Sequence, residues 1–129
     1  TARPHPHATD IGEIIAAIHD GGALAMADCA QAGDGVAAQA AGADIIATTL
    51  CGYTKETAGQ VLPAYLLLSV FAELDAFVIC EGGIHSPTVA AAAMQAGADA
   101  IVVGTAITNT EWLVKEYVAS LGPQRSWPS

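Results

Sequence analysis

Four short apolar runs, each followed by a segment of helix-forming character, constrain the fold of this chain more than any other feature. The runs are continuous rather than alternating, which is typical of strands buried in a parallel sheet. Parallel neighbours need crossover connections, and a helix after each strand supplies them with right-handed geometry. The predicted strands cover residues 23–28, 44–50, 76–81 and 100–104, the helices that follow them cover 33–42, 63–74, 86–97 and 110–122, and one further helix precedes them within 9–22.

The helix ends carry capping residues. In the first helix, Asp10 and the glutamate three residues later resemble a capping box, and four isoleucines in a helical spacing predict an apolar stripe. Ser86 suits the N-cap of a later helix, with Pro87 at its first position. Pro63 is expected to open the helix over 63–74.

Two segments of the chain repeat each other. The stretch QAAGADIIATT (39–49) resembles MQAGADAIVVGT (94–105), and in each a helix ends at glycine, an aspartate follows, and a strand begins. Repeated βα units build the (β/α)8 barrel, which usually needs about 250 residues. With 129 residues and four strands, the chain has half of such a barrel. We therefore expect one partial barrel domain over 1–129, either completed by a missing N-terminal half or a natural half-barrel; a small open α/β sheet is the other alternative.

The charge balance excludes several classes of function. The net charge is -9, and the four basic residues are not clustered, so the chain lacks the basic patch of a nucleic-acid binder or an anionic-membrane binder. No apolar run approaches the ~18 residues of a transmembrane helix. A phosphorylated small molecule stays compatible with this charge, because backbone N–H groups can hold a phosphate without lysines.

The cysteines and histidines indicate neither disulfides nor a metal site. Three cysteines without CxxC spacing read as small buried hydrophobic residues in a reducing cytoplasm, and no pattern supports a catalytic thiol. The histidines lack the spacing of a ligand set, so no metal is predicted. The residues concerned are Cys29, Cys51, Cys80, His5, His7, His19 and His85.

Acidic residues stand at the ends of two predicted strands, where parallel α/β folds place their active sites. Glu81 ends the run AFVICE, and partial burial there would suit a carboxylate for general acid/base work. A structural carboxylate that accepts N–H bonds from a turn is the alternative. Asp28 has the same placement one βα unit earlier, and a capping or substrate-orienting role is at least as compatible with it.

Glycines follow the last two strands. Gly82 and Gly83 come directly after Glu81, and Gly104 with Thr105 follows the fourth strand. Glycine allows a backbone to approach a ligand closely, and barrels often hold a phosphate in the loops after their last two strands. These two loops are therefore predicted to form a phosphate site. Tyr53 could line the same pocket, or pack as an ordinary loop residue.

Four linked motifs resemble one family. LAMADCA, IIATTLCGYT, VICEGGIHSP and IVVGTAIT occur here in the order and spacing of the N-acylglucosamine-6-phosphate 2-epimerases, also called N-acetylmannosamine-6-phosphate 2-epimerases. The opening TARPHP looks like that family's loop after its fourth strand. The resemblance implies strands five to eight of a (β/α)8 barrel, and a cytoplasmic enzyme of sialic-acid breakdown that needs no metal or other cofactor.

The resemblance also implies an activity and residue roles. Such enzymes interconvert N-acetylmannosamine 6-phosphate and N-acetylglucosamine 6-phosphate by removing and returning the proton on C2, so a phosphorylated amino sugar is the expected partner. Glu81 matches the family's active-site glutamate. Residues that match substrate or phosphate contacts are Arg3, Asp28, Thr49, Gly83, Gly104 and Thr105.

The chain departs from the family pattern at two kinds of position. The family's catalytic lysine ends a third strand that is not in this chain, and Lys55 is not its equivalent. Gly83 and Asn109 stand where the family has arginines near the phosphate, and His5 stands where it has a third. We therefore expect the 129 residues to be inactive alone, with a homodimer or a missing N-terminal half-barrel completing the site. The alternatives are a non-catalytic half-barrel that at most binds a sugar phosphate, and another phosphate-binding (β/α)8-barrel enzyme.

Overall fold

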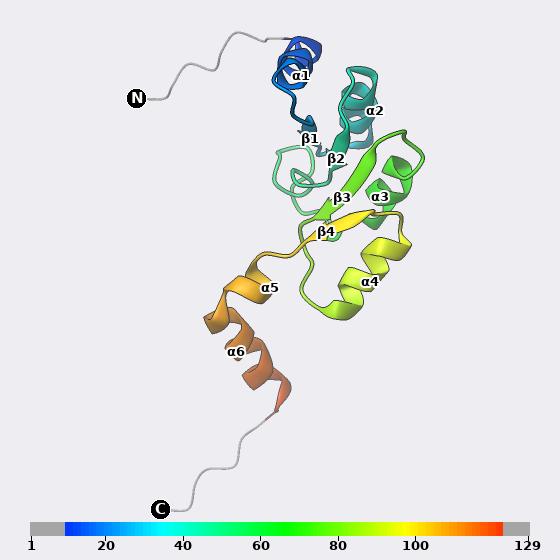
Figure 1. Ribbon diagram of the computed structural model, residues 1–129. Coiled ribbons are helices and arrows are strands. Elements are labelled where there is room, and N and C mark those ends of the chain that lie inside the picture. The colour runs from blue at the N-terminus through cyan, green and yellow to red at the C-terminus, as the bar shows by residue number, and fades with distance from the viewer. Residues whose placement is uncertain (1–9, 123–129) are drawn as a thin grey trace, which may run out of the picture.

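The computed structural model describes residues 10–122, and its centre is a four-stranded parallel sheet. The strand order follows the chain, so each strand pairs with the next one in sequence (Figure 1). Sequential parallel pairing with right-handed crossovers places the connecting helices on one face of a sheet. The strands are β1 (Met26–Asp28), β2 (Ile45–Ala47), β3 (Phe77–Glu81) and β4 (Ala100–Val102).

Three of the helices, α2, α3 and α4, lie along one side of the sheet (Figure 1), and they pack on β2, β3 and β4 in turn. The predicted order of one helix followed by four strand–helix units is confirmed, and the short α5 is an addition that the sequence did not indicate. The helices are α1 (Ile11–Asp20), α2 (Ala32–Ala40), α3 (Tyr65–Phe71), α4 (Pro87–Gln95), α5 (Thr105–Thr108) and α6 (Thr110–Ser120).

The two faces of the sheet differ in burial. Ile46, Val78 and Cys80 point toward the helices and are fully buried in the core. Residues at alternate positions point the other way, because successive side chains of a strand alternate between faces. Among them, Met26 and Phe77 are register partners of Ile45 in β2 and are 46% and 49% exposed. The helix-free face therefore presents apolar side chains to the outside.

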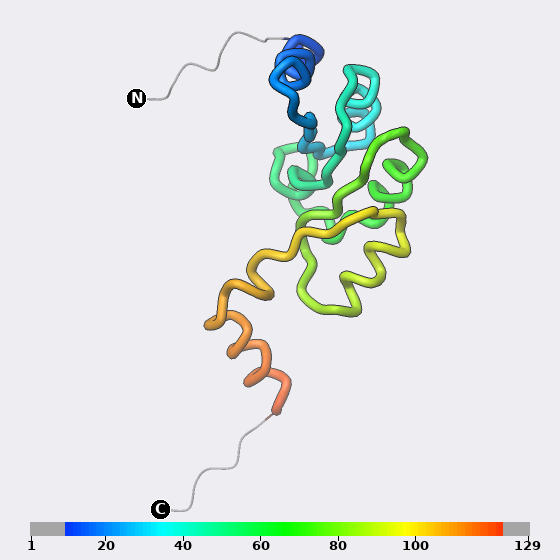
Figure 2. The backbone as a smooth tube through the Cα atoms, viewed as in Figure 1, coloured from blue at the N-terminus to red at the C-terminus, as the bar shows by residue number. Residues whose placement is uncertain are grey.

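Helix α6 extends away from the sheet beyond α5 (Figure 2). None of its residues is buried, and Val114, Tyr117 and Val118 are more than half exposed. Within residues 10–122, no helix has the length and apolarity needed to cross a bilayer.

The helices pack closely where small residues meet large ones. Gly35 of α2 faces the ring of Phe71 of α3, and a Cβ added at Gly35 would lie 2.3 Å from the Phe71 ring. Phe71 is fully buried and cannot swing away into solvent. The absence of a side chain at Gly35 therefore sets how closely α2 approaches α3.

Replacing Gly35 by alanine is expected to lower the free energy of unfolding by about 1–3 kcal/mol, because overpacking outweighs the gain in helix propensity of at most about 1 kcal/mol. Gly33→Ala, in the same helix, is the matched control, since a Cβ there meets nothing within 4 Å. That variant should be neutral or more stable. Urea unfolding monitored by circular dichroism measures both, and equal effects of the two changes would contradict the packing argument.

One local prediction was wrong, and two were confirmed only in part. Helix α3 begins at Tyr65 rather than Pro63, because the Pro63 carbonyl accepts from the Tyr65 N–H in a turn that precedes the helix. Asp10 does cap α1, but it accepts from the Gly12 N–H, so the capping pair with Glu13 is not formed. The isoleucine stripe is only half used: Ile15 is buried, whereas the first and second isoleucines of the helix are almost half exposed.

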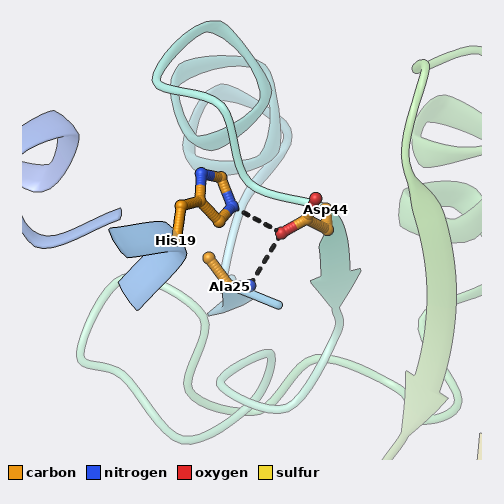
Figure 3. A network of polar contacts seen from close by, with 3 residues as sticks. All are labelled: His19, Ala25 and Asp44. Carbon is orange, nitrogen blue, oxygen red and sulfur yellow. Dashed lines mark hydrogen bonds and ion pairs between the residues drawn. The ribbon is translucent and has the colours of Figure 1, made fainter. Parts of the chain in front are cut away.

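The aspartates of the two similar stretches, 39–49 and 94–105, have a structural role at the amino ends of the strands. Asp44, which precedes β2, accepts from the Ala25 N–H at 2.7 Å and from His19 Nε2 at 2.8 Å (Figure 3). Asp99, which precedes β4, likewise accepts from the Val78 N–H at 2.8 Å. The hydrogen bond from the Ala25 N–H lowers the pKa of Asp44 below its usual range, and the hydrogen bond from His19 lowers it further. Each aspartate thus ties its strand to the neighbouring one, at the sheet end opposite Glu81.

Candidate active site

Two threonines at the end of β2 hold Glu81 in place at the end of β3. The Thr48 hydroxyl donates to the Glu81 carbonyl at 2.9 Å and accepts from the Glu81 N–H at 3.1 Å. Thr48 is fully buried, so this pair of bonds is shielded from water. The Thr49 hydroxyl donates to Glu81 Oε2 at 3.3 Å. Backbone and carboxylate of Glu81 are therefore both anchored to the neighbouring strand end.

Glu81 is half-buried and lines a cavity of about 610 Å³. The cavity is built from the loops that leave β2, β3 and β4, and it also receives Trp112 from α6. The structure therefore brings together most of the residues that the sequence predicts for the site. Those in the cavity wall are Thr49, Tyr53, Glu81, Gly82, Gly83, Gly104 and Thr105.

Backbone conformation explains the paired glycines after Glu81. Gly82 and Gly83 both have positive φ, at 100° and 73°, in the region that side chains rarely adopt. At Gly83 space is missing as well: an added Cβ would lie 2.5 Å from Leu62 Cβ and 2.7 Å from the Leu62 carbonyl carbon. The loop before α3 thus packs on Gly83, and the arginine that the family resemblance places there has no room.

The described wall of this cavity carries one carboxylate, that of Glu81, and neither lysine nor arginine. The imidazole of His85 also lines the cavity, and His85 Nδ1 lies 2.8 Å from the Gly83 carbonyl oxygen. A chemistry that moves a proton with Glu81 and holds an anion with backbone groups and an imidazole is compatible with this wall.

Asp28 is not among the residues that line this cavity. Asp28 is exposed at the end of β1 and lines a separate cavity of about 470 Å³ with Asp34 and Glu56. Leu50 contributes to both cavities, so they are neighbours along the same edge of the sheet. Arg3 lies outside the described residues. The substrate-binding roles of Asp28 and Arg3 therefore stay predictions.

Thr48 is the positioning residue that the site prediction left out. It lies within the predicted strand 44–50, but its two bonds to the Glu81 backbone span 33 residues of sequence. Trp112 was likewise not predicted. It belongs to α6, and the short helix α5, which the sequence did not indicate, separates it from the loop at Gly104. A polar residue directly after a continuous apolar run is the signal that could have identified Thr48.

The three cysteines are free and buried, as the sequence predicts. Burial raises the pKa of Cys29 to about 11, with contributions from Asp34 and Asp28, and burial also raises the pKa of Cys51 and Cys80. A thiolate nucleophile is disfavoured in such surroundings. Within residues 10–122, no three His, Cys, Asp or Glu side chains lie close enough together to hold a metal ion.

The chain is similar to one family over nearly its whole length. The model of the family described as "Putative N-acetylmannosamine-6-phosphate epimerase" matches residues 1–123. Relatives described as "Putative N-acetylmannosamine-6-phosphate 2-epimerase" include one from Thermosynechococcus vestitus, 46% identical over 123 residues, and one from Synechococcus elongatus, 44% identical over 124 residues. Each alignment covers 94% of this chain and 53% of the relative, so the chain spans about half the length of the curated relatives it matches.

A solved structure agrees with the sequence comparison. The N-acetylmannosamine-6-phosphate 2-epimerase from Clostridium perfringens superposes with a TM-score of 0.80 at 33% identity, over 90% of this chain and 51% of that one. The match to the family model covers far more than half of the chain, and the arrangement of its strands agrees with a solved relative. The chain therefore belongs to the N-acetylmannosamine-6-phosphate epimerase family.

Proposed function

We propose that this chain is one half of a (β/α)8-barrel enzyme that interconverts N-acetylmannosamine 6-phosphate and N-acetylglucosamine 6-phosphate, as in sialic-acid breakdown. The observation that carries the proposal is the anchored Glu81 carboxylate, which shares one cavity with the two glycine loops. Family membership supplies the substrate class, and the geometry supplies a role for each group that faces the cavity.

In this proposal Glu81 handles the proton on C2. In the open-chain sugar, C2 lies next to the aldehyde carbon, so its proton can be removed by a positioned base with formation of an enolate. Epimerisation requires a proton to return to the opposite face of C2, and we assign this step to a second acid/base group. The described cavity wall holds no lysine, which agrees with a second group supplied by the other half of the barrel.

The phosphate is assigned to the loops after β3 and β4. Gly82, Gly83 and Gly104 let the backbone come close to the phosphate oxygens, and the Thr105 hydroxyl adds a hydrogen-bond donor. Tyr53 and Thr49 face the same cavity and are assigned to the sugar.

The helix-free face of the sheet supports the half-barrel assignment. Strands in sequential order with helices on one side form a sector of a barrel wall, and the inner side chains then need a second sector to bury them. Phe77 and Met26 are such side chains, and Val102 at the other end of the sheet is 40% exposed. The second sector is either a preceding N-terminal segment or another copy of the chain. We also assign the protein to the cytoplasm, where its free cysteines persist.

Activity of the chain with and without a second half tests the proposal. The 129-residue chain is co-expressed with the complementary half of the Thermosynechococcus vestitus relative, and exchange of the C2 proton with deuterated water is followed by NMR. We expect no exchange from the chain alone and measurable exchange from the complex. A complex of the correct size with no exchange would overturn the epimerase assignment, and turnover by the separate chain as a monomer would overturn the half-barrel assignment.

A further inference from the structure

His85 lies at the meeting point of the two cavities next to the glycine loops. It follows β3 by four residues and precedes Ser86, which caps α4 through the Val89 N–H. One cavity contains Glu81 and the glycines, and the other, of about 560 Å³, lies between α4 and α6. Because His85 lines both, a ligand in the first cavity can reach it.

The hydrogen bond to Gly83 fixes which ring nitrogen carries the proton. A carbonyl oxygen only accepts, so the 2.8 Å contact between His85 Nδ1 and the Gly83 oxygen requires Nδ1 to be the donor. In the neutral ring, Nε2 then carries a lone pair and no proton, so it can only accept a hydrogen bond. Among residues 10–122, Nε2 has no hydrogen-bond partner. Nε2 can donate to an anion only when the whole ring is protonated.

We propose that the protonated His85 binds the phosphate group of the substrate through Nε2. It takes the role of the arginine that has no room at position 83. The inference rests on the proposed phosphate site. It follows from three observations: Nδ1 is committed to Gly83, the described cavity wall has no lysine or arginine, and a side chain at position 83 would collide with Leu62. A cationic ring nitrogen forms a charge-assisted hydrogen bond with a phosphate oxygen.

Binding of a dianion is then linked to uptake of one proton. Affinity for the anion should therefore fall as the pH rises and the ring loses this proton. The other titratable groups that face the two cavities are Glu81 and Tyr53 on one side and Glu116 and Tyr117 on the other. The His85→Gln variant separates the contribution of the histidine from theirs.

Sulfate is the probe that isolates this effect. It has the shape and double charge of a phosphate ester but does not titrate between pH 5.5 and 8, so any pH dependence belongs to the protein. We expect the dissociation constant for sulfate, measured by calorimetry on the full chain, to rise roughly tenfold over this interval. His85→Gln keeps a neutral donor near the Nε2 position and should bind sulfate with no pH dependence. N-acetylglucosamine 6-phosphate should displace the sulfate, and N-acetylglucosamine should not.

One control variant locates the titrating group. His19→Gln changes a histidine that bonds to Asp44 at the opposite end of the sheet, and it should keep the pH dependence. Retention of the dependence in His85→Gln, or its loss in His19→Gln, would overturn the assignment to His85. Absence of any sulfate binding by the native chain would overturn it as well. None of these readouts needs epimerisation, so a failure of the proposed reaction would appear separately, as missing C2 exchange despite normal sulfate binding.

Discussion

Replacing Glu81 by glutamine in the assembled barrel is expected to lower kcat by about 10²- to 10⁴-fold, with KM little changed. Glutamine has nearly the same shape, and its amide oxygen can still accept from the Thr49 hydroxyl that now bonds to Oε2. The bonds from the Thr48 hydroxyl to residue 81 involve the backbone and not the carboxylate, so the strand end should keep its geometry. What is lost is the basic oxygen to which the proposed reaction assigns removal of the C2 proton.

Steady-state kinetics and C2 deuterium exchange measure this effect together. Glu116→Gln is the matched control, since Glu116 is a carboxylate of the neighbouring cavity and does not line the one with Glu81. It should leave kcat within about twofold of the native value, as expected for a surface change away from the reacting atoms. If Glu81→Gln exchanged the C2 proton at the native rate, Glu81 would be removed from the proton transfer and would become a structural carboxylate.

Features that depend on near neighbours in the sequence were predictable. Ser86 accepts from the Val89 N–H three residues later, and Pro87 begins α4, so that helix start was confirmed residue by residue. The parallel order of the sheet also followed from the sequence, because continuous apolar runs separated by helices leave few other topologies. Glu81 could be placed at a strand end for the same reason.

Features that depend on distant neighbours were not predictable. The start of α3 was misplaced because Pro63 belongs to the loop that packs on Gly83, a contact between segments 20 residues apart that no local pattern contains. The bonds from Thr48 to Glu81 need the register of β2 against β3. Asp28 stands at a strand end just as Glu81 does, yet its side chain lines another cavity, since side-chain direction depends on packing around the strand end.

Replacing Gly83 by alanine is expected to lower the free energy of unfolding by about 2–5 kcal/mol. Two costs combine: about 1–2 kcal/mol for a side chain at positive φ, and about 1–3 kcal/mol for overpacking against the loop before α3. The backbone φ is 73°, and the added Cβ would meet Leu62 and the Pro63 nitrogen at 2.5–2.9 Å. Denaturant unfolding of the native and variant chains measures the sum.

Gly59→Ala separates the two costs, because Gly59 has a similar φ of 82° and an added Cβ there meets nothing within 4 Å. That control should lose only the conformational part, about 1–2 kcal/mol. Adding Leu62→Ala should not rescue Gly83→Ala, since the closest atoms are Leu62 Cβ and main-chain atoms, which alanine retains. Equal losses at Gly83 and Gly59 would mean that the loop yields. Position 83 would then have room for a side chain, and the collision with Leu62 would no longer support the assignment of the phosphate to His85.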